Sequence, residues 1–257
     1  MPKTVKEAAK LDAKNGDTKW MDAITNEMTN VRVAFDILKN GDRAPIGHKQ
    51  INCHLIYDVN MEDFRRKYQL VASGHMTETP KYMTYSNVIG RERLHIALTI
   101  AAINDLQVKA GDKMNAYVTA PCREKIWTVL GKEFGTDQGK KAIIVRALYV
   151  IKSSGAAFHA HLEDSMRSMG YTPCRGDNDL WMKPEIDPDR DEYYSYILCY
   201  VDDMLVVQHD AMKTLMKIDK YFKLKPSSIG DPNIYLGAKL KYTCAENVVW
   251  CWTLIPS

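Results

Sequence analysis

The chain has 257 residues, of which 46% are hydrophobic and 26% are charged, a composition typical of a globular protein with one large core or two modest ones. No apolar run approaches the roughly 20 residues that a membrane helix needs, and the N-terminus mixes both charge signs without an apolar segment. Membrane-spanning and secreted proteins are therefore excluded, and we expect an intracellular protein. The net charge of +3 is too small to indicate a nucleic-acid partner by itself.

The first predicted elements are a leader and a helix. Residues 1–17 are polar and unpatterned, which predicts a loose leader. Apolar residues then recur at helical spacing, so we expect an amphipathic helix whose buried face is formed by Trp20, Ile24, Met28 and Val31.

A hairpin with a cationic tip is expected next. Residues 54–59 and 68–72 have the pattern of two strands, and the basic residues Arg65, Arg66 and Lys67 lie between them. A second basic cluster between residues 139 and 162 contains no Asp or Glu and consists of Lys140, Lys141, Arg146 and Lys152. Either cluster could hold phosphates, but charge alone fits a solvated basic face equally well.

The middle of the chain predicts two helices and a strand. Residues 91–104 have the apolar pattern of a buried helix, and residues 106–110 alternate as a strand that ends at Gly111-Asp112. A carboxylate therefore lies at a strand end. A further helix opens at Ser153-Ser154, closes at Gly170 and has Phe158, Leu162 and Met166 on one face.

The strongest strand signal, residues 193–207, is interrupted by Asp202-Asp203. Taken alone, this pair is better explained as a tight hairpin turn, where Asp is favoured. Asp112 at the end of another strand changes the interpretation, because carboxylates suit Mg²⁺, and two such ions about 3.5–4 Å apart can assist phosphoryl transfer. Three acids from two strands would form that scaffold.

The cysteines and histidines do not indicate a second metal site. No cysteine pair has the close spacing of a zinc ribbon or a redox motif, so we expect reduced thiols. His159 and His161 are two residues apart and would point in different directions on a helix.

Several segments together resemble one family. Residues 200–203 read Tyr-Val-Asp-Asp between apolar strands and resemble the catalytic hairpin of reverse transcriptases. Residues 110–117, Ala-Gly-Asp-Lys-Met-Asn-Ala-Tyr, resemble the first catalytic motif of the copia-type retrotransposon enzymes. The resemblance covers about residues 18–252, and further segments agree with it in family order, namely 70–75, 146–149, 155–158, 179–181 and 235–237.

The resemblance implies a fold and a division of the chain. The fold would be α+β, a right-hand polymerase with an antiparallel palm sheet backed by helices and a fingers subdomain. The fingers would comprise about residues 18–105 and 120–165, and the palm about 106–119 and 166–242. The sequence ends at Ser257, so we expect the thumb and the ribonuclease H domain to be truncated or absent.

The resemblance also implies the reaction. The chain would be an RNA-directed DNA polymerase that takes an RNA or DNA template with a primer and a deoxynucleoside triphosphate. Two Mg²⁺ ions, with Mn²⁺ as an alternative, would be held by Asp112, Asp202 and Asp203 and would serve nucleotidyl transfer to the primer 3′-hydroxyl. The compartment would be the cytoplasm, within a virus-like particle, or the nucleus.

Other site residues follow from the same resemblance. Tyr117 would be the aromatic gate that rejects a ribose 2′-hydroxyl, although core packing is its plain alternative. The incoming nucleotide would also meet the cations Arg65, Arg66, Lys67 and Lys152. Primer and template would be contacted by the hairpin tyrosine and by a primer grip, that is, by Tyr200, Tyr235, Leu236 and Gly237.

Two departures from the family leave the activity open. Val150 stands where the family usually has glycine, and Gln69 stands where it commonly has arginine, a cation that an amide cannot replace on phosphate. An alternative hypothesis is therefore a catalytically inactive relic that retains the fold and binds nucleic acid. A third is an unrelated binding module in which Asp202-Asp203 is only a turn.

Overall fold

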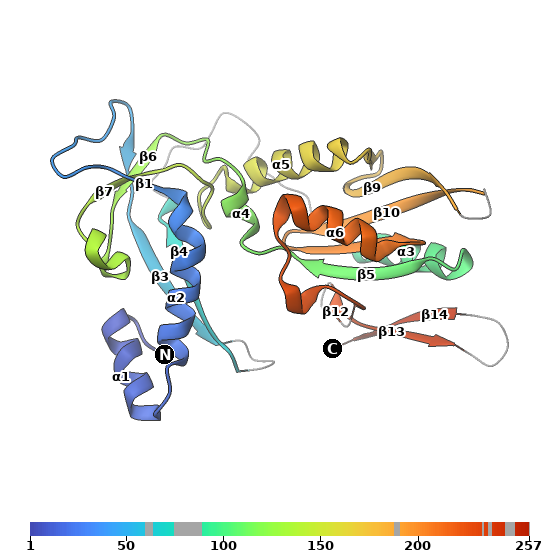
Figure 1. Ribbon diagram of the computed structural model, residues 1–257, viewed down its shortest axis with the longest axis horizontal. Helices are drawn as coiled ribbons and strands as arrows, with labels where there is room; N and C mark the ends of the chain where they lie inside the picture. The colour runs from blue at the N-terminus through green and yellow to red at the C-terminus, as the bar shows by residue number, and fades with distance from the viewer. Residues whose placement is uncertain are drawn as a thin grey trace. The chain divides into compact units, whose positions relative to one another are not determined.

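The computed structural model describes residues 1–59, 64–74, 89–187, 191–232, 234–235, 238–244 and 250–256 (Figure 1). The chain divides into two compact units. The first unit comprises Met1–Tyr85 and Tyr117–His161, and the second comprises Ser86–Ala116 and Leu162–Ser257.

The first unit begins with a helix where a loose leader was expected. Helix α1 (Val5–Asn15) starts at Thr4, whose side chain accepts a hydrogen bond from the Glu7 N–H, and it ends at Gly16. Its Asp12 is only 3% exposed and accepts hydrogen bonds from two backbone N–H groups at the start of α2 (Lys19–Val31). The prediction for residues 1–17 was wrong, because one buried carboxylate ties a largely polar helix to its neighbour.

Helix α2 has the buried face that its spacing predicts. Trp20, Ile24, Met28 and Val31 are all buried. The helix packs against β4 (Arg66–Ala72), which pairs in antiparallel register with β3 (Cys53–Val59), so the predicted strand pair is confirmed.

The rest of the first unit is a small sheet with short helical segments. Its strand order is β1 (Phe35–Ile37), β7 (Lys141–Ile144), β6 (Ile126–Val129) and β2 (Lys49–Gln50), in which only the β2–β6 pair is parallel. Two 3₁₀ helices, η1 (Arg32–Ala34) and η3 (Lys132–Asp137), flank these strands in sequence. One apolar core joins this sheet to α1, α2 and the β3–β4 pair.

The second unit is built on a five-stranded antiparallel sheet. The strand order is β5 (Gln107–Asp112), β11 (Asp203–Gln208), β10 (Glu192–Tyr200), β9 (Asp177–Ile186) and β8 (Thr172–Cys174). A further three-stranded antiparallel sheet follows in the order β12 (Ile234–Tyr235), β13 (Ala238–Cys244) and β14 (Trp250–Pro256).

Two helices cover opposite faces of the five-stranded sheet. Side chains alternate along a strand, and Val108, Leu205 and Val207 share a core with α3 (Arg91–Ile103). On the other face lies α6 (Ala211–Phe222), which approaches so closely that a Cβ at Gly111 would lie 3.2 Å from a methyl group of Leu215. Helix α3 therefore belongs to the second unit, and the division into fingers and palm stays a prediction.

Three short or connecting elements complete the description. Two of the three boundaries between the units fall in α4 (Ala116–Thr119) and α5 (Ser154–Ser168), and η4 (Pro226–Ser228) precedes β12. Helix α5 confirms the prediction of a helix between Ser153-Ser154 and Gly170. The mixture of helices and mainly antiparallel sheets confirms the α+β class. None of the helices in the described ranges is long and apolar enough to cross a membrane.

Candidate active site

Two of the predicted acids lie at the ends of neighbouring strands. Strand β5 ends at Asp112, strand β11 begins at Asp203, and these two residues are direct partners in the antiparallel ladder. Directly opposed residues have Cβ atoms about 4.5–5.5 Å apart on the same face. Strand pairing therefore brings together two acids that are 91 positions apart in the sequence.

Asp202 occupies a different position, in the turn between β10 and β11. Tyr200 pairs with Asp203, so Val201 and Asp202 form a two-residue connection. Val201 has a φ of 49°, a left-handed conformation that is strained for a β-branched residue. The backbone oxygen of Asp202 accepts a hydrogen bond of 2.8 Å from the Lys113 N–H. Asp202 is thus both a residue of the hairpin turn and one of the three predicted acids.

Asp203 has a raised pKa, in part because the other two acids lie nearby. Burial and, after it, the negative charges of Asp112 and Asp202 raise the pKa of Asp203 to about 6. The positive charges of Lys225 and Lys113 oppose this effect. Because like charges close together disfavour ionisation, this arrangement favours the binding of a cation.

Lys113 is a buried lysine inside the second unit. Its residue is 0% exposed, and its Nζ lies 5.5 Å from the centroid of the Phe222 ring. Burial lowers the pKa of Lys113, whereas negative charge on Cys199 and on the neighbouring carboxylates Asp202, Asp203 and Asp179 raises it. A buried lysine thus lies behind the acids.

A short segment around η4 holds Asp112 through several of its groups. The Lys225 Nζ lies 2.6 Å from Asp112 Oδ2, and the Lys225 N–H donates to the Asp112 backbone oxygen. The Asp112 N–H donates in turn to Ser228 Oγ over 2.8 Å. Asp112 Oδ1 is buried and has no hydrogen-bond partner within the described part of the chain.

A cavity of about 610 Å³ opens beside the two opposed acids. Besides β5 and β11, its wall is formed by the segment from Ser227 to Pro232 and by Tyr235. Among the described residues no group of three or more His, Cys, Asp or Glu is close enough to hold a metal ion. Mg²⁺ needs only one or two protein carboxylates when a substrate supplies phosphates. The opposed pair with its unpartnered oxygen fits such an ion.

The predicted primer contacts are placed only in part. Tyr235 lines the cavity, but it is 2% exposed and its hydroxyl donates to the Leu198 backbone oxygen over 3.1 Å. Tyr200 is half-buried opposite Asp203 at the end of β10. Leu236 and Gly237 lie outside the described residues, so the primer grip stays a prediction.

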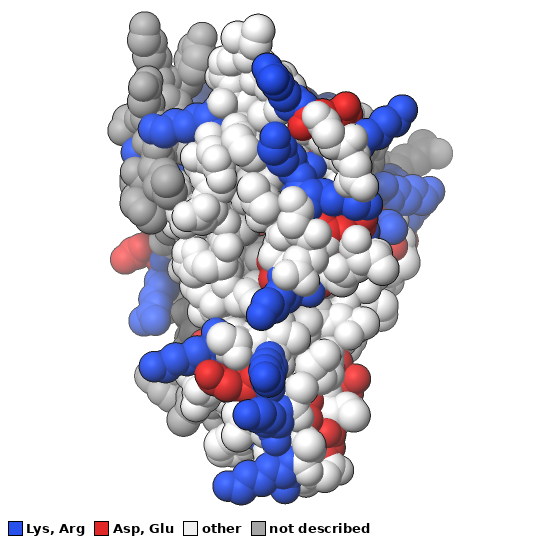
Figure 2. All heavy atoms as spheres, turned by 90° about the vertical axis from the view of Figure 1, so that its left-hand side faces the viewer, with Lys and Arg blue, Asp and Glu red and all other residues white. Residues whose placement is uncertain are grey.

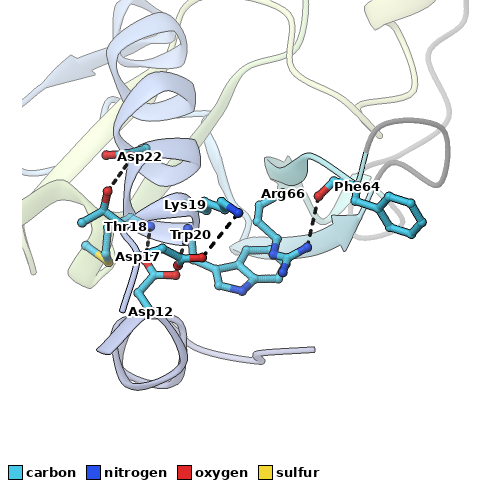
Figure 3. Close-up of polar contacts among 9 residues, drawn as sticks. Asp12, Asp17, Thr18, Lys19, Trp20, Asp22, Phe64 and Arg66 are labelled. Carbon is cyan, nitrogen blue, oxygen red and sulfur yellow. Dashed lines mark hydrogen bonds and ion pairs between the residues drawn. The ribbon is translucent and has the colours of Figure 1, made fainter. Parts of the chain in front are cut away.

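The basic cluster of the first unit is partly built into the unit itself. Arg66 and Lys67 lie in β4 and pair with Val59 and Asp58, so they belong to the strand and not to a tip. The guanidinium of Arg66 lies 5.4 Å from the Trp20 ring centroid and donates to the Phe64 backbone oxygen (Figure 3). Arg65 directly precedes the strand and is exposed.

Tyr117 and Lys152 are likewise in the first unit. The Tyr117 ring makes edge-to-face contacts with Tyr149 and Phe158, with centroid distances of 4.9 and 5.8 Å. Such contacts are those of an aromatic packing cluster. Lys152 is half-buried just before α5. The gate and nucleotide roles of these two residues stay predictions.

Positive charge is concentrated in the first unit. Its ranges contain 20 Lys and Arg against 14 Asp and Glu, a net charge of +6, so the second unit has a net charge of −3. On the face drawn in Figure 2, Lys and Arg side chains are spread widely. The second cluster is partly paired, since the Lys140 Nζ lies 2.7 Å from Asp137 and Arg146 donates to the Thr119 oxygen.

Three residues beside the acids were not predicted as part of the site: Lys113, Lys225 and Ser228. Lys113 follows Asp112 directly, but its position in a strand pattern does not reveal complete burial. Lys225 and Ser228 are more than 110 residues from Asp112, and no sequence spacing connects them with it.

A family model matches most of the chain. The model of a family described as reverse transcriptase (RNA-dependent DNA polymerase) matches residues 34–249, a range that includes both opposed acids and the hairpin between β10 and β11. No curated protein matches the chain significantly.

Proposed function

Because this chain belongs to the reverse transcriptase (RNA-dependent DNA polymerase) family, we propose that it is the polymerase domain of a copia-type retrotransposon. Its reaction is nucleotidyl transfer from a deoxynucleoside triphosphate to a primer 3′-hydroxyl on an RNA or DNA template. In this proposal the second unit is the palm and the first unit contributes the fingers of a right-hand polymerase.

The observation that supports this proposal is the direct pairing of Asp112 with Asp203 beside a cavity. Mg²⁺ bound there would supply activation of the primer hydroxyl and charge neutralisation on the triphosphate. The chain's own contribution is to hold the two carboxylates on one face of the sheet. Asp202, in the adjacent turn, adds negative charge to the same place.

The charge difference between the units supports a nucleic-acid partner. A polymerase must accept any base sequence, so it binds its template through phosphates and shape. The first unit has a net charge of +6 and contains both basic clusters. We propose that the template strand is attracted to this unit, and that the protein acts inside the cell, in a cytoplasmic virus-like particle or in the nucleus.

A primer-extension assay tests the proposed reaction. The chain should incorporate deoxynucleotides on a primed RNA template when Mg²⁺ or Mn²⁺ is present. Asp112→Asn and Asp203→Asn should each abolish incorporation, whereas Asp164→Asn, at an exposed position of α5, should leave it unchanged. Incorporation that survives either active-site substitution contradicts the proposed roles of these acids.

An inactive relic of the same family is the second candidate, and Val150 favours it. This valine has a φ of 73°, in the left-handed region that suits glycine. The altered site therefore carries both a strained backbone and a branched side chain. On this hypothesis Val150→Gly combined with Gln69→Arg creates incorporation where the unaltered chain has none, and equal activity of the two chains contradicts it.

A further inference from the structure

The ammonium group of Lys225 forms an ion pair with one oxygen of the Asp112 carboxylate. Its Nζ lies 2.6 Å from Asp112 Oδ2, which leaves Oδ1 as the carboxylate oxygen with no hydrogen-bond partner among the described residues. Lys225 therefore already neutralises an acid that the proposed function assigns to a divalent cation. An ammonium group and a metal ion at one carboxylate repel each other and share its negative charge.

The backbone around Lys225 is fixed more firmly than its side chain. The Lys225 N–H donates to the Asp112 backbone oxygen, and the Lys225 oxygen accepts a hydrogen bond from Ser228 Oγ. The side chain is 47% exposed, so its flexible stem can turn toward solvent while the backbone stays in place. Lys225 can thus leave Asp112 without unfolding the segment.

The second lysine beside the acids does not have this freedom. Lys113 is 0% exposed, and its Nζ lies near the Phe222 ring inside the second unit. Its side chain stays buried behind the acids and has no access to solvent. Of these two lysines, only Lys225 is placed to exchange with a cation from solvent.

We propose that Lys225 is a resident counter-cation of the acid pair and that a divalent metal ion displaces its ammonium group from Asp112. The proposal rests on the metal site of the proposed function. Displacement of Lys225 makes metal binding weaker than the two carboxylates alone would allow. It also keeps the opposed acids partly neutralised when no metal ion is bound.

Mn²⁺ binding to the full chain, measured by electron paramagnetic resonance of the free ion, tests the competition. Lys225→Met should bind Mn²⁺ about twofold to fivefold more tightly than the unaltered chain, the range expected for the loss of a partly exposed ion pair. Lys225→Arg keeps the charge and should bind Mn²⁺ as the unaltered chain does. Lys223→Met removes an exposed charge two residues away and should change the affinity less than twofold.

Amine labelling gives a second readout that needs no variant. Labelling of Lys225 with an acylating reagent, followed by mass spectrometry and normalised to Lys223, should increase when Mn²⁺ is added. Unchanged labelling, or an unchanged Mn²⁺ affinity of Lys225→Met, overturns the proposal.

The two proposals fail in different ways. Equal Mn²⁺ binding by the unaltered chain and Lys225→Met overturns the competition but leaves the metal site intact. No binding by either chain overturns both the competition and the metal site. Tighter binding by Lys225→Met in a chain without polymerase activity supports the competition and contradicts only the proposed reaction.

Discussion

Asp112 and Asp203 are direct partners in the β5–β11 ladder, so two carboxylates lie opposite each other on the same face of the sheet. Like charges directly opposite each other in an antiparallel pair are destabilising. The pKa of Asp203 is accordingly raised to about 6, first by burial and then by its acidic neighbours. This destabilising pair lies beside the cavity, and a raised pKa beside a cavity is typical of a functional group.

Asp203→Asn should stabilise the metal-free protein more at pH 7 than at pH 4. The folded-state pKa of about 6 lies above the ordinary value of 3.8, so the native state binds more protons than the unfolded state in this window. The contribution of Asp203 to stability therefore falls as pH rises through the window. The gain at pH 7 should be on the order of 1 kcal/mol after solvent screening, measured by urea unfolding.

Asp164→Asn is the matched control for this titration, because Asp164 is exposed on α5. At pH 7 it should change the stability less than Asp203→Asn does. A stability difference between Asp203→Asn and the unaltered chain that does not change with pH contradicts the assigned pKa shift.

Val150→Gly should stabilise the protein by about 1 kcal/mol. The φ of 73° is strained for a β-branched residue, and glycine adopts it without a steric penalty. Val33→Gly is the control, since Val33 is also 59% exposed but lies in the 3₁₀ helix η1. It should destabilise by about 0.5–1 kcal/mol. Equal urea midpoints for the two variants contradict the prediction.

Gly74→Ala should destabilise the first unit by about 2–3 kcal/mol. A Cβ at Gly74 would overlap the backbone oxygen of Val150, and a backbone atom cannot turn away as a side chain can. The pairing of β4 with this segment, in which the Ala72 N–H donates to the Tyr149 oxygen, would be disturbed. Thermal unfolding followed by circular dichroism measures the loss.

Gly176→Ala is the comparison for Gly74, because its nearest neighbour to an added Cβ is an Arg93 side-chain nitrogen at 3.7 Å. It should change the stability by less than about 0.5 kcal/mol. If Gly74→Ala melts at the same temperature as Gly176→Ala, the close approach between Gly74 and the Val150 backbone is not rigid.

Asp12→Ala should destabilise the protein by about 1–2 kcal/mol. The Asp12 carboxylate accepts hydrogen bonds from the Trp20 and Met21 N–H groups, while the N-cap residue Thr18 makes no side-chain capping bond (Figure 3). Asp12→Asn keeps one acceptor and should lose about half as much in urea unfolding. If the urea midpoint of Asp12→Ala equals that of the unaltered chain, the prediction of a loose leader is restored.

Local pattern predicted the elements whose packing repeats along one face. Apolar periodicity predicts the buried face of α2 and the strands on either side of Asp202-Asp203, because apolar residues recur where one face of an element is buried. Helix α1 was not predicted, because few of its residues are apolar; Ala8 and Asp12 are its buried residues, and Val5 and Leu11 pack against the same core.

The positions of Asp112 and Asp203 at strand ends were predicted, but the cations that lie beside them were not. Asp112 and Asp203 lie at strand ends that the pattern locates, and the family resemblance supplied their pairing. Arg66 was predicted at a hairpin tip to bind nucleotide, but it lies in β4 over the Trp20 ring. Stacking of this kind depends on which helix covers the strand, and no local pattern carries that information.

The sequence alone determined the α+β class, the family and the acids at the two strand ends, because periodicity and short motifs are local properties of the chain. The tertiary structure decided what surrounds those acids. Strand pairing placed Asp203 opposite Asp112, and a segment more than 110 residues away supplied Lys225 to one of its oxygens. Contacts between distant residues depend on how the whole chain packs, so their consequences for charge and metal binding are readable only in the folded protein.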